Sequence, residues 1–167
     1  MMLNKKNNTI LIIIFFIILL SIISTLIIEH VLDHQPCNLC LYERIPYFVS
    51  ALLLIYIFLF KKYERIIFLI LFLIFVLSFL LAFYHFGIEQ GFFSESFVCN
   101  VENQSEILSK EELLKELNQK IVSCKEVTFR FLDLSLANIN AILSVVLSII
   151  FLQLFFNYGS SSISQYK

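Results

Sequence analysis

Four long runs of apolar residues constrain the fold of this 167-residue chain more than any other feature. The first, Ile10 to Ile28, has no charged residue, and as a helix it would be about 29 Å long, close to the hydrocarbon thickness of a bilayer. A cleaved signal peptide has a shorter apolar core, of about 7–15 residues, followed by a small-residue cleavage site, and this run shows neither feature. The first run is therefore predicted to span a membrane.

The other three runs are Pro46 to Phe60, Ile66 to Ile88 and Ile139 to Phe156. Since Pro46 to Phe60 would reach only about 22 Å, its helix is expected to begin earlier, near Cys40. Irregular geometry is expected at Pro46, because proline disfavours helix at the preceding residue. The predicted spans are about 10–28, 42–60, 66–88 and 139–156. They form a single all-α membrane domain over residues 1–167, a bundle of four transmembrane helices.

The composition agrees with a membrane protein and excludes two other classes. Hydrophobic residues make up 59% of the chain and charged residues only 15%. A soluble domain is about one quarter charged, and a disordered chain is poor in Leu, Ile, Val and Phe. The net charge of −1 gives no reason to expect a nucleic-acid partner, so membrane lipid is the expected surrounding.

The charged residues predict the orientation in the membrane, because short basic loops stay cytoplasmic. The basic residues that mark the cytoplasmic side are Lys5, Lys6, Lys61, Lys62 and Arg65. By contrast, residues 29–44 carry three acidic residues and one basic residue, and residues 89–138 carry nine acidic and five basic residues. We expect both termini in the cytoplasm and two cysteine-bearing loops, 29–41 and 89–138, on the exoplasmic side.

The large exoplasmic loop contains a helical pattern. Ser109 and Glu112 have the spacing of a capping box, and apolar residues then repeat at helical spacing, at Leu113, Leu114, Leu117 and Ile121. This pattern predicts a short amphipathic helix, which either lies on the membrane surface or packs against the rest of the loop.

Four cysteines on one oxidising side indicate two disulfides. Three pairings are possible, and Cys37–Cys40 with Cys99–Cys124 is favoured because the first two cysteines are close in the chain. A Cys99–Cys124 bridge would close a loop of about 25 residues and could stabilise the fold by about 3 kcal/mol, so a structural staple would explain it. A Cys-x-x-Cys bridge constrains little chain and is typical of redox pairs.

Two further residues are candidates for the chemistry of this pair. Cys40 lies near a helix start, whose dipole stabilises a thiolate, and Arg44 lies on the same helical face. The sequence has no nucleotide-binding glycine pattern, haem-attachment motif or iron–sulfur spacing, so a quinone from the bilayer is the candidate electron acceptor. His85, near the exoplasmic end of the third run, could donate to a quinone carbonyl. The alternatives are that Arg44 contacts only lipid headgroups and that His85 is structural.

The sequence also contains a possible set of metal ligands. His30 and His34 lie one helical turn apart, and with Cys37 and Cys40 they could form a four-ligand zinc site. We do not favour this site, because it leaves the other two cysteines unexplained and because an exoplasmic cysteine pair tends to be oxidised whereas zinc needs thiolates. No metal is expected.

Taken together, these motifs resemble the DsbB family of bacterial disulfide-forming membrane oxidoreductases over nearly the whole chain. One motif is Cys37-Asn38-Leu39-Cys40-Leu41-Tyr42-Glu43-Arg44, which enters the second span. Another is Tyr84-His85-Phe86-Gly87-Ile88-Glu89-Gln90-Gly91, which leaves the third span. The second cysteine pair, Cys99 and Cys124, lies on the loop before the fourth span.

The resemblance implies a four-helix bundle in the bacterial inner membrane, with a bound ubiquinone or menaquinone. It also implies a soluble periplasmic partner, a thioredoxin-fold oxidase resembling DsbA. Cys99 would form the mixed disulfide with this partner, and Cys124 would be its pairing cysteine. Cys37 would exchange with the loop pair, and Cys40 would face the quinone as a thiolate. Arg44 and His85 match family positions near the quinone ring.

The function predicted from the sequence is thus that of a quinone-dependent protein-disulfide oxidoreductase that reoxidises the partner. Two alternatives stay open. One is a non-enzymatic membrane scaffold with two structural disulfides. The other is a quinone-linked oxidoreductase of the vitamin K epoxide reductase type, in which the redox pair belongs late in the bundle, whereas Cys37 and Cys40 precede the second span.

Overall fold

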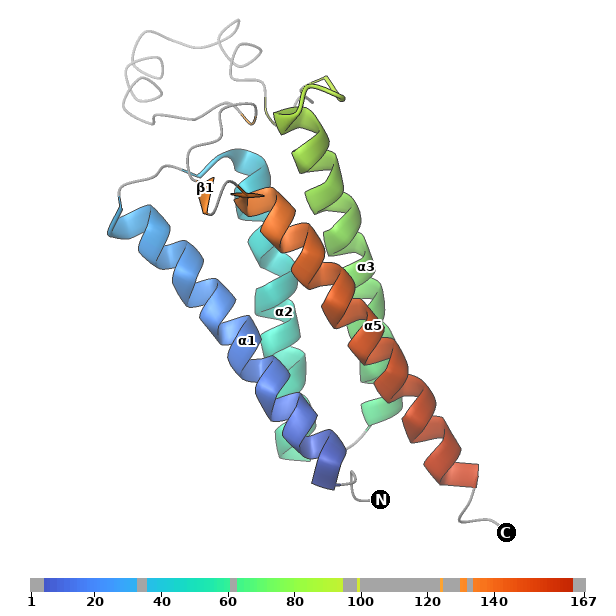
Figure 1. Cartoon of the computed structure of the whole chain (residues 1–167). Helices are drawn as coiled ribbons and strands as arrows, with labels where there is room; N and C mark the ends of the chain where they lie inside the picture. The colour runs from blue at the N-terminus through green and yellow to red at the C-terminus, as the bar shows by residue number, and fades with distance from the viewer. Residues whose placement is uncertain are drawn as a thin grey trace, which may run out of the picture.

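A computed structural model of the chain describes residues 5–32, 36–60, 63–94, 99, 124, 130–131 and 134–163. Its helices are α1 (Lys5–His30), α2 (Asn38–Phe60), α3 (Glu64–Glu89) and α5 (Leu136–Ile163). Two short strands, β1 (Arg130–Phe131) and β2 (Leu134–Ser135), pair antiparallel just before α5. All four helices are long and apolar enough to cross a membrane, which confirms the predicted all-α, four-helix membrane fold. The start of α1 and the end of α5 lie at the same end of the bundle (Figure 1).

The boundaries of the second helix differ from the prediction. Helix α2 begins at Asn38, two residues before the start expected near Cys40, and it continues through Pro46 without the expected irregularity. Proline removes one backbone hydrogen bond, here to the carbonyl of the exposed Tyr42, and the packing of α2 tolerates this loss. The other helices extend a few residues beyond their apolar runs. The amphipathic helix predicted around residues 109–121 lies outside the described residues.

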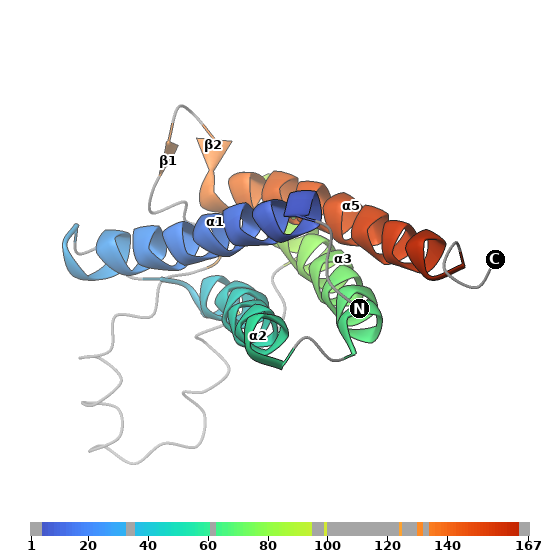
Figure 2. The ribbon, with the colours of Figure 1, turned by 90° about the horizontal axis from the view of Figure 1, so that it is seen from below.

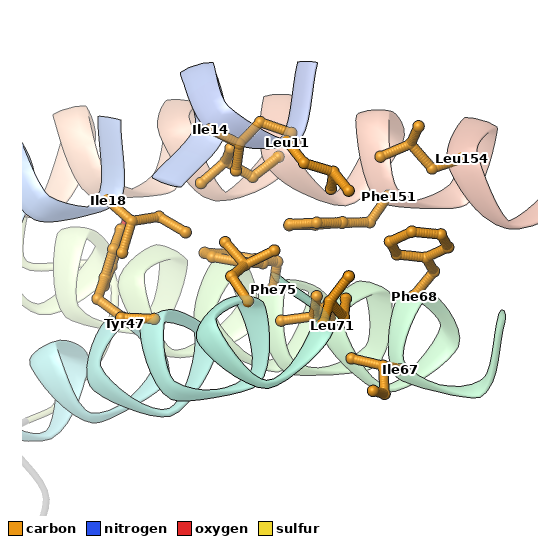
Figure 3. Packing of buried hydrophobic residues seen from close by; sticks show 14 residues of the cluster. Leu11, Ile14, Ile18, Tyr47, Ile67, Phe68, Leu71, Phe75, Phe151 and Leu154 are labelled. Atoms are coloured by element: carbon orange, nitrogen blue, oxygen red, sulfur yellow. The ribbon is translucent and has the colours of Figure 1, made fainter. Parts of the chain in front are cut away.

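The bundle core lies where all four helices meet. Helix α3 packs against α5 and α2, and α2 also packs against α1 (Figure 2). Phe75 of α3 is near the centre of the core, with the rings of Tyr47 and Phe151 each 5.7 Å from its own (Figure 3). Aromatic pairs at this separation add to the stabilisation from burial, so these contacts join α2, α3 and α5.

Outside this core, the helices present apolar side chains to their surroundings. Phe16, Leu52 and Leu77 are among the most exposed large apolar residues of α1, α2 and α3. Several polar side chains of the helices find hydrogen-bond partners within the protein, which suits a bilayer. Ser24, for example, donates to a carbonyl one turn earlier in α1, and the hydroxyl groups of Ser78 and Ser144 lie 3.1 Å apart between α3 and α5.

The chain turns sharply at the end of α3. Gly91 has a φ of +77°, a conformation that glycine adopts without strain. The carbonyl of Gly87 accepts hydrogen bonds from the N–H groups of Phe92 and Phe93, at 2.8 and 3.2 Å. The Phe93 ring then lies over Gly87, where an added Cβ would be 2.2 Å from the ring. This turn lies at the end of the bundle that carries Cys37, Cys40 and the Cys99–Cys124 pair, here called the cysteine end.

Candidate functional site

Cys37 and Cys40 lie at the N-terminus of α2. Cys37 immediately precedes the helix and is 4% exposed, and Cys40 is in the first turn. The backbone N–H of Cys40 donates to the Cys37 sulfur at 3.2 Å, as in a helix N-cap. The two sulfur atoms are 2.6 Å apart and both cysteines are free in this structure, so the Cys37–Cys40 disulfide stays a prediction.

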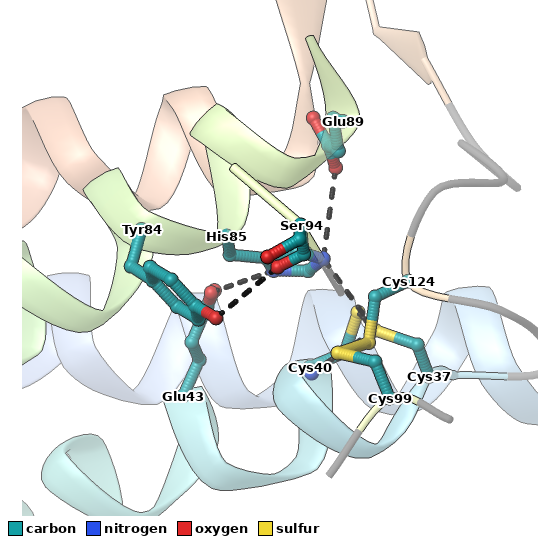
Figure 4. The surroundings of a disulfide bond; sticks show 9 residues. All are labelled: Cys37, Cys40, Glu43, Tyr84, His85, Glu89, Ser94, Cys99 and Cys124. Atoms are coloured by element: carbon teal, nitrogen blue, oxygen red, sulfur yellow. Dashed lines mark hydrogen bonds and ion pairs between the residues drawn. A yellow bond between two sulfur atoms is a disulfide. The ribbon is translucent and has the colours of Figure 1, made fainter. Parts of the chain in front are cut away.

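Behind this pair lies a polar network of residues from α2, α3 and α5, of which Figure 4 shows Glu43 and His85. His85 Nε2 lies 3.5 Å from the sulfur of Cys37, and His85 Nδ1 lies 2.7 Å from Oε1 of Glu43. Asn140 donates to the other carboxylate oxygen of Glu43 at 2.7 Å, and Tyr47 donates to the amide oxygen of Asn140. Since the carboxylate accepts at Nδ1, the histidine proton is directed to Nδ1 and Nε2 faces the sulfur.

These contacts favour a negative charge on Cys37. The hydrogen bond from the Cys40 thiol lowers the pKa of Cys37 to about 5, with burial acting in the opposite direction. The hydrogen bond and the charge of His85 lower this pKa further. The sequence predicts the thiolate on Cys40. The geometry favours Cys37 because this residue precedes the first helical turn and receives the N–H group, and the quinone-facing role of Cys40 stays a prediction.

The second cysteine pair packs directly against the first. Cys99 and Cys124 form a disulfide, the pairing favoured from the sequence, with a Cα–Cα distance of 5.5 Å. Both residues are buried in one cluster with Cys37, Leu39 and Ile88, against which Cys40 also packs. Four cysteines that are spread over 88 positions of sequence, from 37 to 124, therefore meet at one point (Figure 4). Such contact is the arrangement needed for thiol–disulfide exchange.

Arg44 links the site to α1. Its guanidinium group donates to the carboxylate of Glu29, and both side chains are partly buried. The pairing places a cation one helical turn from Cys40, as the sequence predicted from their spacing. Because it has a carboxylate partner within the protein, Arg44 is not merely an interfacial arginine that contacts headgroups.

A cavity of about 290 Å³ lies beside the first pair. Its polar lining includes Cys37, Cys40, Arg44, His85 and Glu89. Apolar residues of α1 and α5 form much of the remaining wall, among them Leu20, Ile28, Ile139 and Leu143. An apolar cavity with a few convergent polar groups is the typical form of a small-molecule site.

The histidines considered for zinc do not contribute to this site in the described part of the chain. His30 is exposed, and its Nδ1 lies 3.2 Å from the carbonyl oxygen of Leu26 in its own helix. His34 lies outside the described residues. The ring that faces the cysteine pair is that of His85, which arrives from α3.

Four residues of the site were not singled out from the sequence. Glu29 and Glu43 had counted only as loop charges, although Glu43 belongs to the Cys-x-x-Cys-x-Tyr-Glu-Arg string. Glu89 lies four residues after His85 and shares its helical face, a spacing that could have indicated a pair. No local sequence pattern indicated Asn140, because its partner Glu43 is 97 residues away in the sequence.

Comparison with known proteins identifies a related family. A family model described as "Disulfide bond formation protein DsbB" matches residues 7–154, a segment that contains all four cysteines. The chain is also similar to an uncharacterized protein of Rickettsia prowazekii (strain Madrid E). The two are 24% identical over 144 residues, which cover 85% of this chain and 83% of that protein. No solved structure matches.

Proposed function

Because this chain belongs to the DsbB family of membrane disulfide bond formation proteins, we propose that it is a quinone-dependent thiol–disulfide oxidoreductase. Its electron donor is a soluble periplasmic thioredoxin-fold oxidase resembling DsbA, and its acceptor is ubiquinone or menaquinone. The observation that carries this proposal is the contact between the two cysteine pairs at the wall of an apolar cavity.

The first half of the reaction takes place at the loop pair. A thiolate of the reduced partner attacks Cys99, which breaks the Cys99–Cys124 disulfide and releases the Cys124 thiolate. The second thiolate of the partner then displaces Cys99 from the mixed disulfide. The partner leaves oxidised, and the loop pair holds its two electrons.

The second half transfers these electrons across the contact between the pairs. A loop thiolate attacks the Cys37–Cys40 disulfide at Cys37, Cys40 leaves as a thiolate, and the other loop thiolate closes Cys99–Cys124 again. The low pKa of Cys37 supports this direction, because a stabilised thiolate makes the corresponding disulfide a stronger oxidant. His85 accepts or returns the proton of Cys37 at Nε2, and Glu43 holds the ring in position.

The residues around the cavity fit a quinone. Apolar side chains of α1 and α5 suit its ring and tail, while Arg44 offers N–H groups for its carbonyl oxygens, as does His85 when Nε2 carries a proton. When bound, a quinone supplies a lipid-soluble acceptor of two electrons and two protons. Arg44, held by Glu29, keeps a positive charge next to Cys40 and the cavity.

We further propose that the protein lies in the bacterial inner membrane with both termini in the cytoplasm. The basic residues Lys5 and Lys6 begin α1, whose start lies at the end of the bundle opposite the cysteines (Figure 1). The positive-inside rule places that end in the cytoplasm and the cysteine end in the oxidising periplasm.

Quinone reduction by purified protein tests the proposed activity. Cys40→Ser should abolish turnover with a reduced DsbA-like partner, because the pair can no longer form its disulfide, while the variant retains quinone bound during purification. Ser148→Ala, a buried hydroxyl of α5 away from the cavity lining, serves as the matched control and should keep its activity. Undiminished quinone reduction by Cys40→Ser would overturn the proposal.

A further inference from the structure

We propose that Cys37, Cys40, His85 and Glu89 of the reduced protein form a binding site for a thiophilic divalent cation such as Zn²⁺. The site is distinct in its function from the proposed electron relay, because an ion held there blocks the reoxidation of the cysteine pair. It is also distinct from the His30 and His34 set suggested by sequence spacing, since the histidine comes from α3.

Three candidate ligand atoms already lie close together. The sulfur atoms of Cys37 and Cys40 and a ring nitrogen of His85 all lie within 4.8 Å of one another. The 3.5 Å between Cys37 Sγ and His85 Nε2 is close to the ~3.6 Å expected for a sulfur and a nitrogen bound to one tetrahedral zinc ion. The two sulfurs, 2.6 Å apart, would have to separate to ~3.8 Å, which a side-chain rotation of Cys40 can supply.

Glu89 is the fourth ligand of the proposed site, and its side chain must move towards the sulfurs, because its carboxylate is not among the atoms that lie within 4.8 Å of one another. Its Oε1 lies 3.8 Å from His85 Nε2, and its side chain is only 6% exposed. The other oxygen, Oε2, is buried without a hydrogen-bond partner among the described residues. A buried carboxylate oxygen without a partner is costly, and coordination of a cation next to it would relieve that cost.

Glu43 prepares His85 for metal binding. The carboxylate accepts from Nδ1 at 2.7 Å, which leaves the lone pair of Nε2 directed at the cysteines. A carboxylate on the far nitrogen of a ligating histidine is the usual support of zinc sites, and its removal typically lowers metal affinity about 10–100-fold. Asn140 in turn holds the second oxygen of Glu43 at 2.7 Å.

The binding reaction is a ligand exchange without electron transfer. The ion forms bonds to both sulfurs as thiolates and to Nε2 of His85, any protons on these atoms go to the solvent, and no group is oxidised or reduced. The oxidised pair lacks thiolates and cannot bind the ion in this way. Metal binding and disulfide formation therefore compete for the same two sulfurs, so Zn²⁺ would hold the protein in its reduced form until a chelator removes it.

Titration of the full-length protein in detergent tests the site. A Cys99→Ser/Cys124→Ser background leaves one dithiol, which is reduced and freed of reductant without air. Addition of Cd²⁺ should produce thiolate-to-metal charge-transfer absorbance that saturates at one ion per chain, and competition with a chromophoric chelator measures Zn²⁺ affinity. The oxidised protein should show neither signal. These measurements need no quinone or partner protein, so their outcome does not depend on whether the proposed enzymatic function is correct.

Variants identify the ligands. Cys37→Ser should abolish binding, while His85→Gln and Glu89→Gln should each weaken Zn²⁺ binding by about 10-fold or more. Glu43→Gln keeps the shape of the side chain and should weaken binding about 10–100-fold through His85. His30→Gln is the matched control and should change nothing. Unchanged Zn²⁺ affinity in both His85→Gln and Glu89→Gln, or a loss in His30→Gln, would overturn the proposed site.

Discussion

At the scale of single residues, the chemistry of this protein depends on a few polar side chains buried at one end of an apolar bundle. Titratable groups inside a membrane protein are costly unless each has a partner. His85 contacts Cys37 on one ring nitrogen and Glu43 on the other, and Asn140 completes the hydrogen bonds of Glu43. The pKa of the Cys37 thiol is therefore lowered in part by His85, a residue of another helix.

This coupling makes a prediction about the titration of Cys37. The pKa of this thiol is about 5, so the thiolate is present above that pH and is lost as the pH falls through it. His85→Gln removes a hydrogen bond and a positive charge that both lower the pKa, so the midpoint should move to higher pH by about one unit or more. The ultraviolet absorbance of the thiolate, followed against pH in the reduced Cys99→Ser/Cys124→Ser protein, measures the shift. His30→Gln should leave the midpoint unchanged, and an equal midpoint in His85→Gln would contradict the assigned role.

At the scale of secondary-structure elements, the end of α3 determines how the chain approaches the first cysteine pair. Three residues in its last turns make different contacts. His85 contacts Cys37, Gly87 lies under the Phe93 ring, and Ile88 packs in the cysteine cluster. Glycine in the middle of a helix is normally unfavourable by about 1 kcal/mol relative to alanine. Its presence here is explained by the close approach of Phe93.

A double-mutant cycle tests this explanation. Gly87→Ala should destabilise the protein by about 1–3 kcal/mol, because the new methyl group meets the Phe93 ring and displaces it. In a Phe93→Ala background the same substitution should be neutral or slightly stabilising, since the obstacle is gone and alanine favours helix. Thermal unfolding in detergent measures both effects. Equal destabilisation in the two backgrounds would show that the ring is not the cause.

At the scale of the whole molecule, four spans bring two cysteine pairs from separate loops into one cluster. Apolar residues cover the outside of the bundle, and the cavity beside the cluster lies between α1, α2, α3 and α5. A scaffold with two structural staples has no need for contact between them. A relay does, because exchange requires that the sulfurs meet.

Redox titration separates these two possibilities. If the two pairs are redox centres in series, both should be reduced in graded thiol buffers at potentials above about −300 mV. Structural disulfides stay oxidised until the potential of the buffer falls below about −300 mV. Thiols trapped by alkylation and counted by mass spectrometry report the state of each pair. The Cys37→Ser/Cys40→Ser protein isolates the loop pair as a control. Two pairs that both stay oxidised to below about −300 mV would support the scaffold.

Much of this architecture could be predicted from the sequence because it depends on local properties. The length and hydropathy of each run predict the four helices, and the Cys-x-x-Cys spacing predicts a redox pair wherever the segment lies. Local rules were less accurate at Pro46, where they predicted an irregular helix. Tertiary packing instead keeps α2 regular from Asn38 onwards.

The contacts that define the site could not be predicted in this way. His85 meets Cys37 across 48 residues, and Asn140 meets Glu43 across 97 residues. No periodicity within one segment encodes which faces of separate helices will meet, since this depends on how the side chains of all four helices pack together. The sequence by itself therefore determined a four-span membrane protein with two cysteine pairs. Only the tertiary structure decided which side chains surround each sulfur, because those side chains come from helices that are far apart in the sequence.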